Sequence, residues 1–260
     1  LYRLVGSEMC IRDRVFMAGR IGTDNFGKQI YDTLSNQNIN LDGLKMVDEA
    51  TGMSVALIGS DGIYCAVVVS GANQTIDLSE IAVPDDLTVL VLQNEINTDA
   101  NFEIIKKVPK STFIILNAAP ALTPNKDFFE RIDLLVVNQL EAKMLLNEEP
   151  SIFNNLDALR KLQNLGPKEV IITMGADGYT GISKNGEIFS EPGIKVDVLS
   201  THGAGDSFVG TLAAFICKGE PINIAAQYAQ ASSALHVKTP IDQREKILQA
   251  DIENMFSLNQ

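Results

Sequence analysis

The segment from Ser200 to Ser207 (STHGAGDS) has the residue types and spacing of a site for phosphate chemistry. Gly203, Ala204 and Gly205 are small, so a phosphate can approach the free N–H groups at the start of the apolar helix that we expect to follow. The carboxylate of Asp206 would repel a phosphate, so it is unfavourable in a site that only binds one. It has a purpose if it accepts a proton from a hydroxyl group that attacks the phosphate. The segment therefore predicts phosphoryl transfer with Asp206 as the general base. A simple helix cap is the alternative role for Asp206.

Polar residues also lie at the ends of four short, apolar segments rich in β-branched residues. The segments are 87–92, 113–116, 134–137 and 170–173, and they have the pattern of strands buried on both faces. The polar residues at their ends are Gln93 to Glu95, Asn117, Asn138 to Glu141, and Thr173 to Gly175. Ligands of open α/β sheets bind beyond the carboxyl ends of the strands. The recurrence predicts one common binding edge, although Asn117 and Asn138 taken singly are equally well explained as helix caps or turn formers.

The elements that must position these residues alternate along the chain. Helices are expected at 98–108, 125–131, 141–146 and 154–165, between the strand segments, and a further strand at 194–199 leads into the glycine-rich turn. Such alternation predicts an α/β fold with a mostly parallel central sheet flanked by helices. Two hairpins, at 54–70 and 179–190, are expected outside the parallel sheet, and the first is the better candidate for a flap over an active site.

Composition narrows the class of protein. The chain has 260 residues, of which 45% are hydrophobic, and a net charge of −12, so it can form one large acidic α/β domain. The acidity argues against nucleic acid and anionic membranes as partners, and no apolar run reaches the length of a membrane span. The three cysteines form no CxxC pair and there are two histidines, which argues against disulfides and zinc and favours the cytoplasm.

Residues 1–14 (LYRLVGSEMCIRDR) show no period of a strand or helix. They are similar to translated adaptor sequence, so we expect a foreign or disordered tail, with an ordinary mobile terminus as the alternative. We expect residues 15–260 to form a single domain, with a lid hairpin inserted at about 53–70.

Four motifs together resemble the ribokinase-like carbohydrate kinase family. Residues 201–210 (THGAGDSFVG) match its Gly-Ala-Gly-Asp turn, Asn138 to Glu141 (NQLE) its Asn-x-x-Glu, and Thr173 to Gly175 with Gly178 its nucleotide loop. Residues 19–27 (GRIGTDNFG) match its G-x-x-G-x-D-x-F-G. That match accounts for a near P-loop at 22–29, which lacks the hydroxyl residue that would bind Mg²⁺.

The resemblance implies a fold, an activity and a set of roles. The implied activity is ATP-dependent phosphorylation of a sugar, with Asp206 as the base and Gly203 to Gly205 as the anion hole. Asn138 and Glu141 would hold Mg²⁺ through water. Thr173, Gly175 and Gly178 would contact the nucleotide.

Within the family, some features are most similar to ribokinases. These are the hairpin at 54–69, Gln93 to Glu95, and Asn117 to Pro120. They imply transfer to the primary hydroxyl of D-ribose, giving ribose 5-phosphate, with Ala56, Ile58 and Glu95 at the sugar. They also imply that the full-length protein forms a homodimer through the lid.

The chain departs from the family pattern in several places. A strand with a sugar-binding Asp and a Gly-Gly-x-x-x-Asn loop should precede Val15, so we expect a truncated gene product. Thr211 stands where Gly or Ala is usual. Members of the family bind a monovalent cation with an Asp at the position of Ser200 and with a later loop, which is short here around 238–240. These two departures argue against activation of this chain by potassium.

Other functions stay open at this point. They are a catalytically dead fragment, a nucleotide- or sugar-binding protein, and a kinase for another sugar or a nucleoside. A Rossmann dehydrogenase is disfavoured, because Phe208 stands where the third glycine of G-x-G-x-x-G would be.

Overall fold

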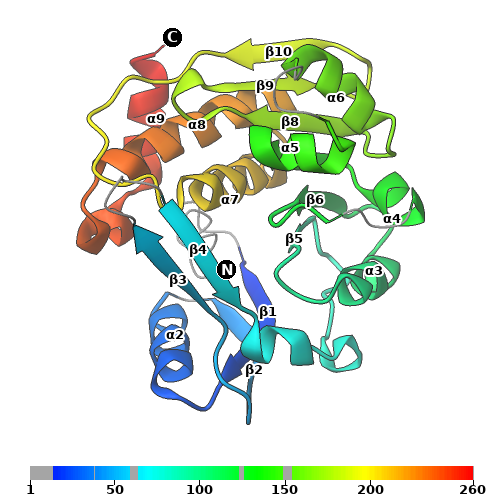
Figure 1. Ribbon diagram of the computed structural model, residues 1–260, viewed down its shortest axis with the longest axis vertical. Coiled ribbons are helices and arrows are strands. Elements are labelled where there is room, and N and C mark those ends of the chain that lie inside the picture. The colour runs from blue at the N-terminus through cyan, green and yellow to red at the C-terminus, as the bar shows by residue number, and fades with distance from the viewer. Residues whose placement is uncertain (1–13, 38, 59–63, 123–125, 149–153, 260) are drawn as a thin grey trace. The chain divides into compact units, whose positions relative to one another are not determined.

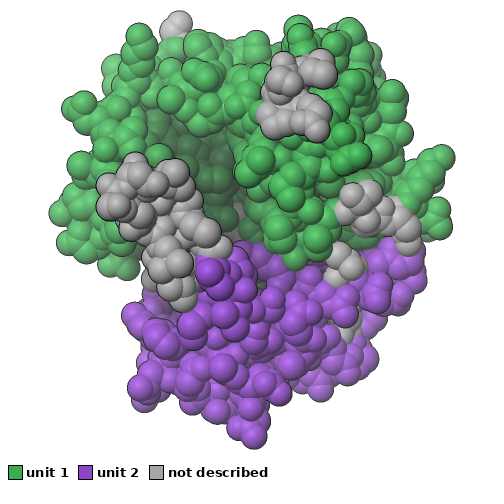
Figure 2. Space-filling model, in the orientation of Figure 1, with its two compact units in different colours: residues 1–13, 85–94, 108–260 green, residues 14–84, 95–107 purple. Residues whose placement is uncertain are grey.

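The structure is a computed structural model that describes residues 14–37, 39–58, 64–122, 126–148 and 154–259. The chain divides into two compact units, which Figure 2 distinguishes by colour. Unit 1 comprises residues 1–13, 85–94 and 108–260, and unit 2 comprises residues 14–84 and 95–107.

Unit 1 is built on a six-stranded sheet with the strand order β10-β9-β8-β7-β6-β5 (Figure 1). Four strands are parallel: β5 (Val89–Gln93), β6 (Phe113–Asn117), β7 (Leu134–Asn138) and β8 (Glu169–Thr173). The expected α/β fold with a mostly parallel sheet is confirmed. The expected hairpin at 179–190 is confirmed, because β9 (Tyr179–Ile182) pairs antiparallel with β10 (Ile188–Glu191). It is not separate from the sheet, since β9 also pairs antiparallel with β8 and extends the sheet beyond its parallel part. The hairpin supplies the backbone partners that the edge of β8 would otherwise lack.

Helices α4 (Lys126–Arg131), α5 (Gln139–Leu146) and α6 (Asn155–Gln163) connect the parallel strands, and α7 (Ala204–Cys217), α8 (Ile222–Lys238) and α9 (Gln249–Ser257) follow the sheet in the chain. The one-face apolar spacing of α7 buries Phe208, Val209 and Leu212 in a cluster with Ile115 and Leu134. Side chains alternate across a strand, so Leu135 and Ile114, both 0% exposed, belong to the opposite face. Both faces of the sheet are therefore covered, as the unbroken apolar strands predict.

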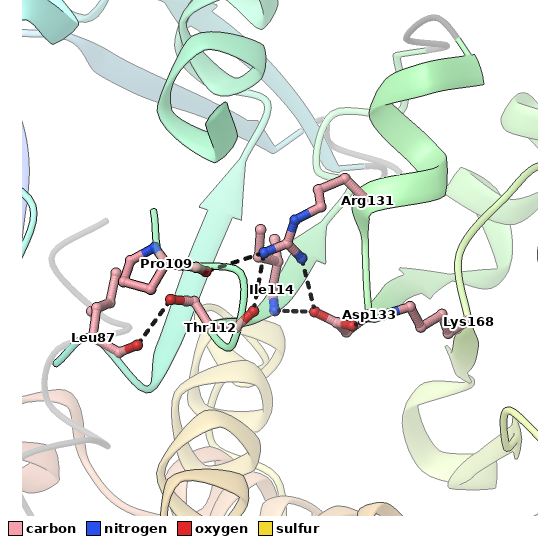
Figure 3. A network of polar contacts seen from close by, with 7 residues as sticks. All are labelled: Leu87, Pro109, Thr112, Ile114, Arg131, Asp133 and Lys168. Carbon is pink, nitrogen blue, oxygen red and sulfur yellow. Dashed lines mark hydrogen bonds and ion pairs between the residues drawn. The ribbon is translucent and has the colours of Figure 1, made fainter. Parts of the chain in front are cut away.

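A network of polar contacts around Asp133 lies at the amino ends of the parallel strands (Figure 3). Its carboxylate accepts hydrogen bonds from Ile114 N at 2.8 Å and Lys168 Nζ at 2.6 Å, and it lies 3.4 Å from Arg131 Nη1. Asp133 is 8% exposed, and these charged and backbone donors compensate for the burial of its carboxylate. The network ties the starts of β6, β7 and β8 together, away from the carboxyl edge.

Unit 2 holds β1 (Phe16–Gly22), which is parallel to β2 (Asn40–Val47), together with helices α2 (Asn25–Ser35) and α3 (Thr98–Lys107). It also holds β3 (Met53–Ile58) and β4 (Tyr64–Val69), which pair antiparallel from Met53↔Val69 to Ile58↔Tyr64. The expected hairpin is confirmed, while residues 59–63 between its strands lie outside the described part of the chain. Short 3-10 turns η1 (Gly71–Thr75) and η2 (Leu78–Glu80) follow.

The strand expected at 194–199 is not formed. The segment pairs with no strand of the sheet, which ends at β10, and Val198 and Leu199 are 55% and 62% exposed. Leu199 N instead donates to Val237 O in α8 at 2.8 Å. The apolar residues thus indicated a strand that had no neighbour to complete its backbone hydrogen bonds.

Candidate active site at the carboxyl edge of the sheet

The register of the parallel strands brings four of the polar residues to one edge of the sheet. Gln93 at the end of β5 lies opposite Asn117 at the end of β6, and Asn138 at the end of β7 lies opposite Thr173 at the end of β8. Parallel strands present their carboxyl ends on the same side, so the shared edge follows from the pairing.

Asp206 joins this edge from α7. Gln93 Nε2 donates to Asp206 Oδ1 at 3.4 Å, which places the carboxylate at the end of β5. The N-cap of α7 is Gly203, and Asp206 lies three residues further on in the first turn. The helix therefore begins before Asp206, and no side chain accepts a hydrogen bond at the cap.

The first turn of α7 forms a cradle of backbone groups. Gly203 has φ +82°, a left-handed conformation that glycine adopts without strain. A Cβ placed on Gly205 would meet no atom within 4 Å, so open space faces this residue. The first N–H groups of a helix lack acceptors within the helix and lie at its positive end. Ala204 N already donates to Thr201 O at 3.1 Å. The cradle fits a phosphate, which can supply acceptors for the other N–H groups of the turn.

Two serines of α8 form hydrogen bonds with the first turn of α7. Ser233 Oγ donates to Ala204 O at 3.0 Å, and the hydroxyls of Ser207 and Ser232 lie 2.9 Å apart in the core. Ser232 and Ser233 were not among the residues expected from the sequence. Their only signal was a Ser-Ser pair within an alanine-rich helix. Further along α7, Thr211 is fully buried, and its Oγ1 has no hydrogen-bond partner among the described residues.

Asn138 and Glu141 form a capping box at the start of α5. Asn138 Oδ1 accepts from Glu141 N at 2.9 Å, and Glu141 Oε2 accepts from Asn138 N at 2.8 Å. Burial raises the pKa of Glu141, with the hydrogen bonds to Asn138 acting in the opposite direction. The Asn-x-x-Glu spacing thus produces a helix cap, the alternative role that the sequence left open. The cap also holds the carboxyl group of Glu141 in a fixed orientation at the edge.

The residues expected at the nucleotide differ in their surroundings. Thr173 Oγ1 donates to Val137 O at 3.4 Å. Gly175 has φ +59° and open space where a Cβ would lie, as a ligand-facing glycine would. Gly178 has φ +90°, and a Cβ there would lie 2.0 Å from Glu191 O. Close packing against the strand β10 therefore explains Gly178 without a ligand.

The expected sugar residues are not brought to this edge by any described contact. Glu95 is half-buried and belongs to unit 2, two residues after β5 ends. Ala56 and Ile58 lie in β3, but their side chains are outside the described part of the structure. Within the described residues, no group of three or more His, Cys, Asp or Glu side chains is placed to hold a metal ion.

The near P-loop at 22–29 contains the start of helix α2, which a side chain caps. Asp24 caps α2 by accepting from Gly27 N at 2.8 Å, and it accepts from Thr51 Oγ1 at 2.6 Å and Thr51 N at 2.8 Å. The hydrogen bond from the Thr51 side chain, together with those from the two N–H groups, lowers the pKa of Asp24 to about 2. A carboxylate held there would repel a phosphate, which agrees with the interpretation that this is no P-loop.

Comparison with known proteins identifies the family. The model of the pfkB family carbohydrate kinases matches residues 5–246. The chain belongs to this family. The ribokinase of Schizosaccharomyces pombe is 30% identical over 236 residues, which cover 86% of this chain and 74% of that protein. The deoxyribokinase of Salmonella typhi is 24% identical over 235 residues, covering 87% of this chain and 76% of that protein.

Solved structures show the same fold. The structure of Arabidopsis thaliana ribokinase complexed with ribose and ATP has a TM-score of 0.85 and 23% sequence identity, and the match covers 98% of this chain and 86% of that one. The chain is thus a pfkB-family carbohydrate kinase with the ribokinase fold. Across the described residues, no helix combines the length and apolar character needed to cross a membrane.

Proposed function

We propose that this pfkB-family protein transfers the γ-phosphoryl group of ATP to the primary hydroxyl of a sugar, with D-ribose as the first candidate and ribose 5-phosphate as the product. The observation that carries the proposal is the position of Asp206. Its carboxylate stands in the first turn of α7, beside an open glycine cradle and at the carboxyl edge of the sheet.

In the proposed reaction, the sugar hydroxyl oxygen forms a bond to the γ-phosphorus as the bond from that phosphorus to the leaving ADP oxygen breaks. Asp206 accepts the hydroxyl proton. The N–H groups of Gly203 to Gly205 stabilise charge on the phosphoryl oxygens, as an oxyanion hole does. The remaining contribution is positioning, which is the main part of catalysis in phosphoryl transfer.

Asn138 and Glu141 are the residues that would hold Mg²⁺, through water. Mg²⁺ keeps several of its waters and binds through one or two carboxylates together with substrate phosphates. A single oriented carboxylate at the edge fits that requirement better than it would fit a metal that needs three protein ligands. Bound Mg²⁺ supplies positive charge that neutralises the phosphates.

The choice of sugar is the finer part of the proposal. The likeness to the Schizosaccharomyces pombe ribokinase and to a ribokinase that binds ribose and ATP favours ribose, and the likeness to a deoxyribokinase keeps deoxyribose as a rival. Glu95, Ala56 and Ile58 are the proposed sugar contacts. Thr173 and Gly175 are the proposed nucleotide contacts, and Gly178 shapes their loop.

The substitution Asp206→Asn tests the proposal. It keeps the size of the side chain but removes the proton acceptor, so the rate of phosphoryl transfer should fall by at least ~10². Binding of ATP should stay the same or tighten slightly, because a negative charge near the phosphates is lost. A single-turnover assay with ribose and a nucleotide titration measure the two effects.

Asp197→Asn is the matched control, because Asp197 is exposed on the segment before the turn and should leave both measurements unchanged. Asp206→Asn with most of the wild-type rate would end the assignment of the base. Wild-type protein that binds ATP without turning over any sugar of a panel would favour the second candidate function, a nucleotide- or sugar-binding protein.

A further inference from the structure

Arg244 makes an unusual set of contacts next to the glycine-rich turn. It lies in the 3-10 segment η5 (Ile241–Lys246), which follows α8, and its side chain is half-buried. Its Nη2 donates to Ser200 O at 3.0 Å, its Nη1 to His202 O at 2.9 Å, and its Nε to Thr239 O at 3.1 Å. One guanidinium group thus binds three backbone carbonyls from two separate parts of the chain.

The three carbonyls form a site for positive charge. Ser200 and His202 belong to the turn that leads directly into the N-cap Gly203, and Thr239 is the C-cap of α8. Carbonyl oxygens that converge on one point replace the hydration shell of a cation. The carboxyl end of a helix adds partial negative charge to the same place. The guanidinium therefore occupies a position with the chemistry of a cation-binding site.

We propose that Arg244 is a built-in cation, which takes the place of a monovalent metal ion beside the glycine-rich turn and makes the reaction independent of potassium. The proposal rests on the proposed function, because it concerns the turn that carries Asp206. The described residues do not fit a separate ion. The carbonyls of Ser200 and His202 already accept from Arg244, and Ser200 offers a hydroxyl in place of a carboxylate.

A second positive charge at this point would be repelled by the guanidinium, since opposition between like charges grows as water is excluded. The neighbouring ring of His236 adds no negative charge. Its Nε2 lies 2.9 Å from Arg244 Nη1 and 3.0 Å from His202 O. The dipoles of the three carbonyls thus face the positive charge of Arg244, as they would face a bound ion.

The consequence for catalysis is positional. Ala204 N donates to Thr201 O at 3.1 Å, so the first turn of α7 is bonded to the residue that lies between Ser200 and His202, whose carbonyls Arg244 holds. Loss of the guanidinium frees two carbonyls of that turn and lets the Gly203 to Gly205 amides shift. A shift of about 1 Å in a positioning element costs on the order of a hundredfold in rate. Arg244 is thus a positioning residue, which acts through the cradle and touches no substrate.

The first test is kinetic and uses the protein in buffers whose only cations are bulky organic ions and Mg²⁺. Added potassium should leave the wild-type rate unchanged. Arg244→Ala should lower kcat by roughly tenfold to a hundredfold, with a smaller effect on the KM for ATP, and millimolar guanidinium or potassium should restore part of the loss. Lys246→Ala removes a positive charge from the same 3-10 segment but leaves the contacts of Arg244 with the turn in place, so this variant should behave as wild type. Activation of the wild-type protein by potassium would overturn the proposal.

The second test needs no turnover, so it separates this proposal from the proposed function. Guanidinium or potassium should raise the thermal midpoint of Arg244→Ala, measured against choline, but should not raise that of wild type or Lys246→Ala. If the midpoint of Arg244→Ala fails to respond to either ion, Arg244 is not a cation substitute, whether or not the protein is a kinase. Arg244→Gln serves if the alanine variant does not fold, because it keeps most of the stem and removes the charge.

Discussion

Glu141 shows how one side chain can serve a structural cap and a proposed metal site together. Its Oε2 closes the capping box with Asn138 N, while burial raises its pKa. A group whose pKa is raised on folding contributes stability that is complete below its unfolded pKa and is lost as the pH rises through the folded pKa. Ionisation of the buried carboxylate therefore lowers the free energy of unfolding, and a metal ion bound beside it would offset this loss.

Glu141→Gln separates the two purposes. Glutamine can still complete the capping box, and it removes the ionisation, so thermal stability at neutral pH should equal or exceed that of wild type. The Mg²⁺ concentration for half-maximal rate should rise by about tenfold or more, in line with losses at supporting metal residues. Thermal melts and a Mg²⁺ titration of the rate measure both. An unchanged Mg²⁺ requirement would remove Glu141 from the metal site.

Among the secondary-structure elements, Asp24 joins three pieces of unit 2. It begins α2 and holds Thr51, which in turn accepts from Gly22 N at the end of β1 at 2.9 Å. The glycines around it are needed for close approach, because a Cβ on Gly27 would lie 2.0 Å from Gly22 O. The motif G-x-x-G-x-D-x-F-G is thus explained by a strand–helix junction.

Asp24→Asn should lower the thermal midpoint at neutral pH, because an amide cannot accept all three hydrogen bonds equally well. The pKa of Asp24 is depressed, so its stabilisation is present above the unfolded value of 3.8 and is lost as the pH falls through about 2. The midpoints of wild type and variant should therefore converge as the pH falls through that window. Asp48→Asn, an exposed substitution nearby, should show no gap at any pH. A gap that stays constant down to pH about 2 would contradict this account.

For the molecule as a whole, the hairpin of unit 2 leaves apolar surface uncovered. Val67, Val68 and Val69 of β4 are 50%, 64% and 47% exposed. Three consecutive exposed valines on a two-stranded sheet are typical of a surface that pairs with another chain. We propose a second copy of this chain as that partner, in line with the expectation from the sequence that the full-length protein forms a homodimer through the lid.

Val68→Lys should shift the protein toward monomers, because a charge on an exposed strand opposes edge-to-edge and face-to-face association. Static light scattering across a range of concentrations measures the change. Leu258→Lys is a suitable control, since Leu258 is 82% exposed and belongs to unit 1, whereas the hairpin belongs to unit 2. Wild-type protein that stays monomeric at high concentration would remove the basis for the assembly.

Local features of this protein follow from its amino-acid sequence alone. Buried strands such as Phe113–Asn117 and Leu134–Asn138 were predictable because they consist of short apolar runs between polar ends. The turn at Gly203 to Asp206 was predictable because small residues directly before an apolar helix are typical of a phosphate-binding turn. Family likeness then added the proposed metal-binding roles of Asn138 and Glu141, because spacing alone explains these residues equally well as a helix cap.

Features that depend on residues far apart in the chain emerge only when the chain has folded. The hairpin at 179–190 follows from its local sequence pattern, but only its pairing with β8 makes it the edge of the sheet. The segment 194–199 has the composition of a strand but pairs with no strand of the six-stranded sheet. Arg244 reaches carbonyls 42 and 44 residues earlier in the chain. Local periodicity records which face of an element is apolar, whereas partners for backbone groups exist only once distant segments have packed.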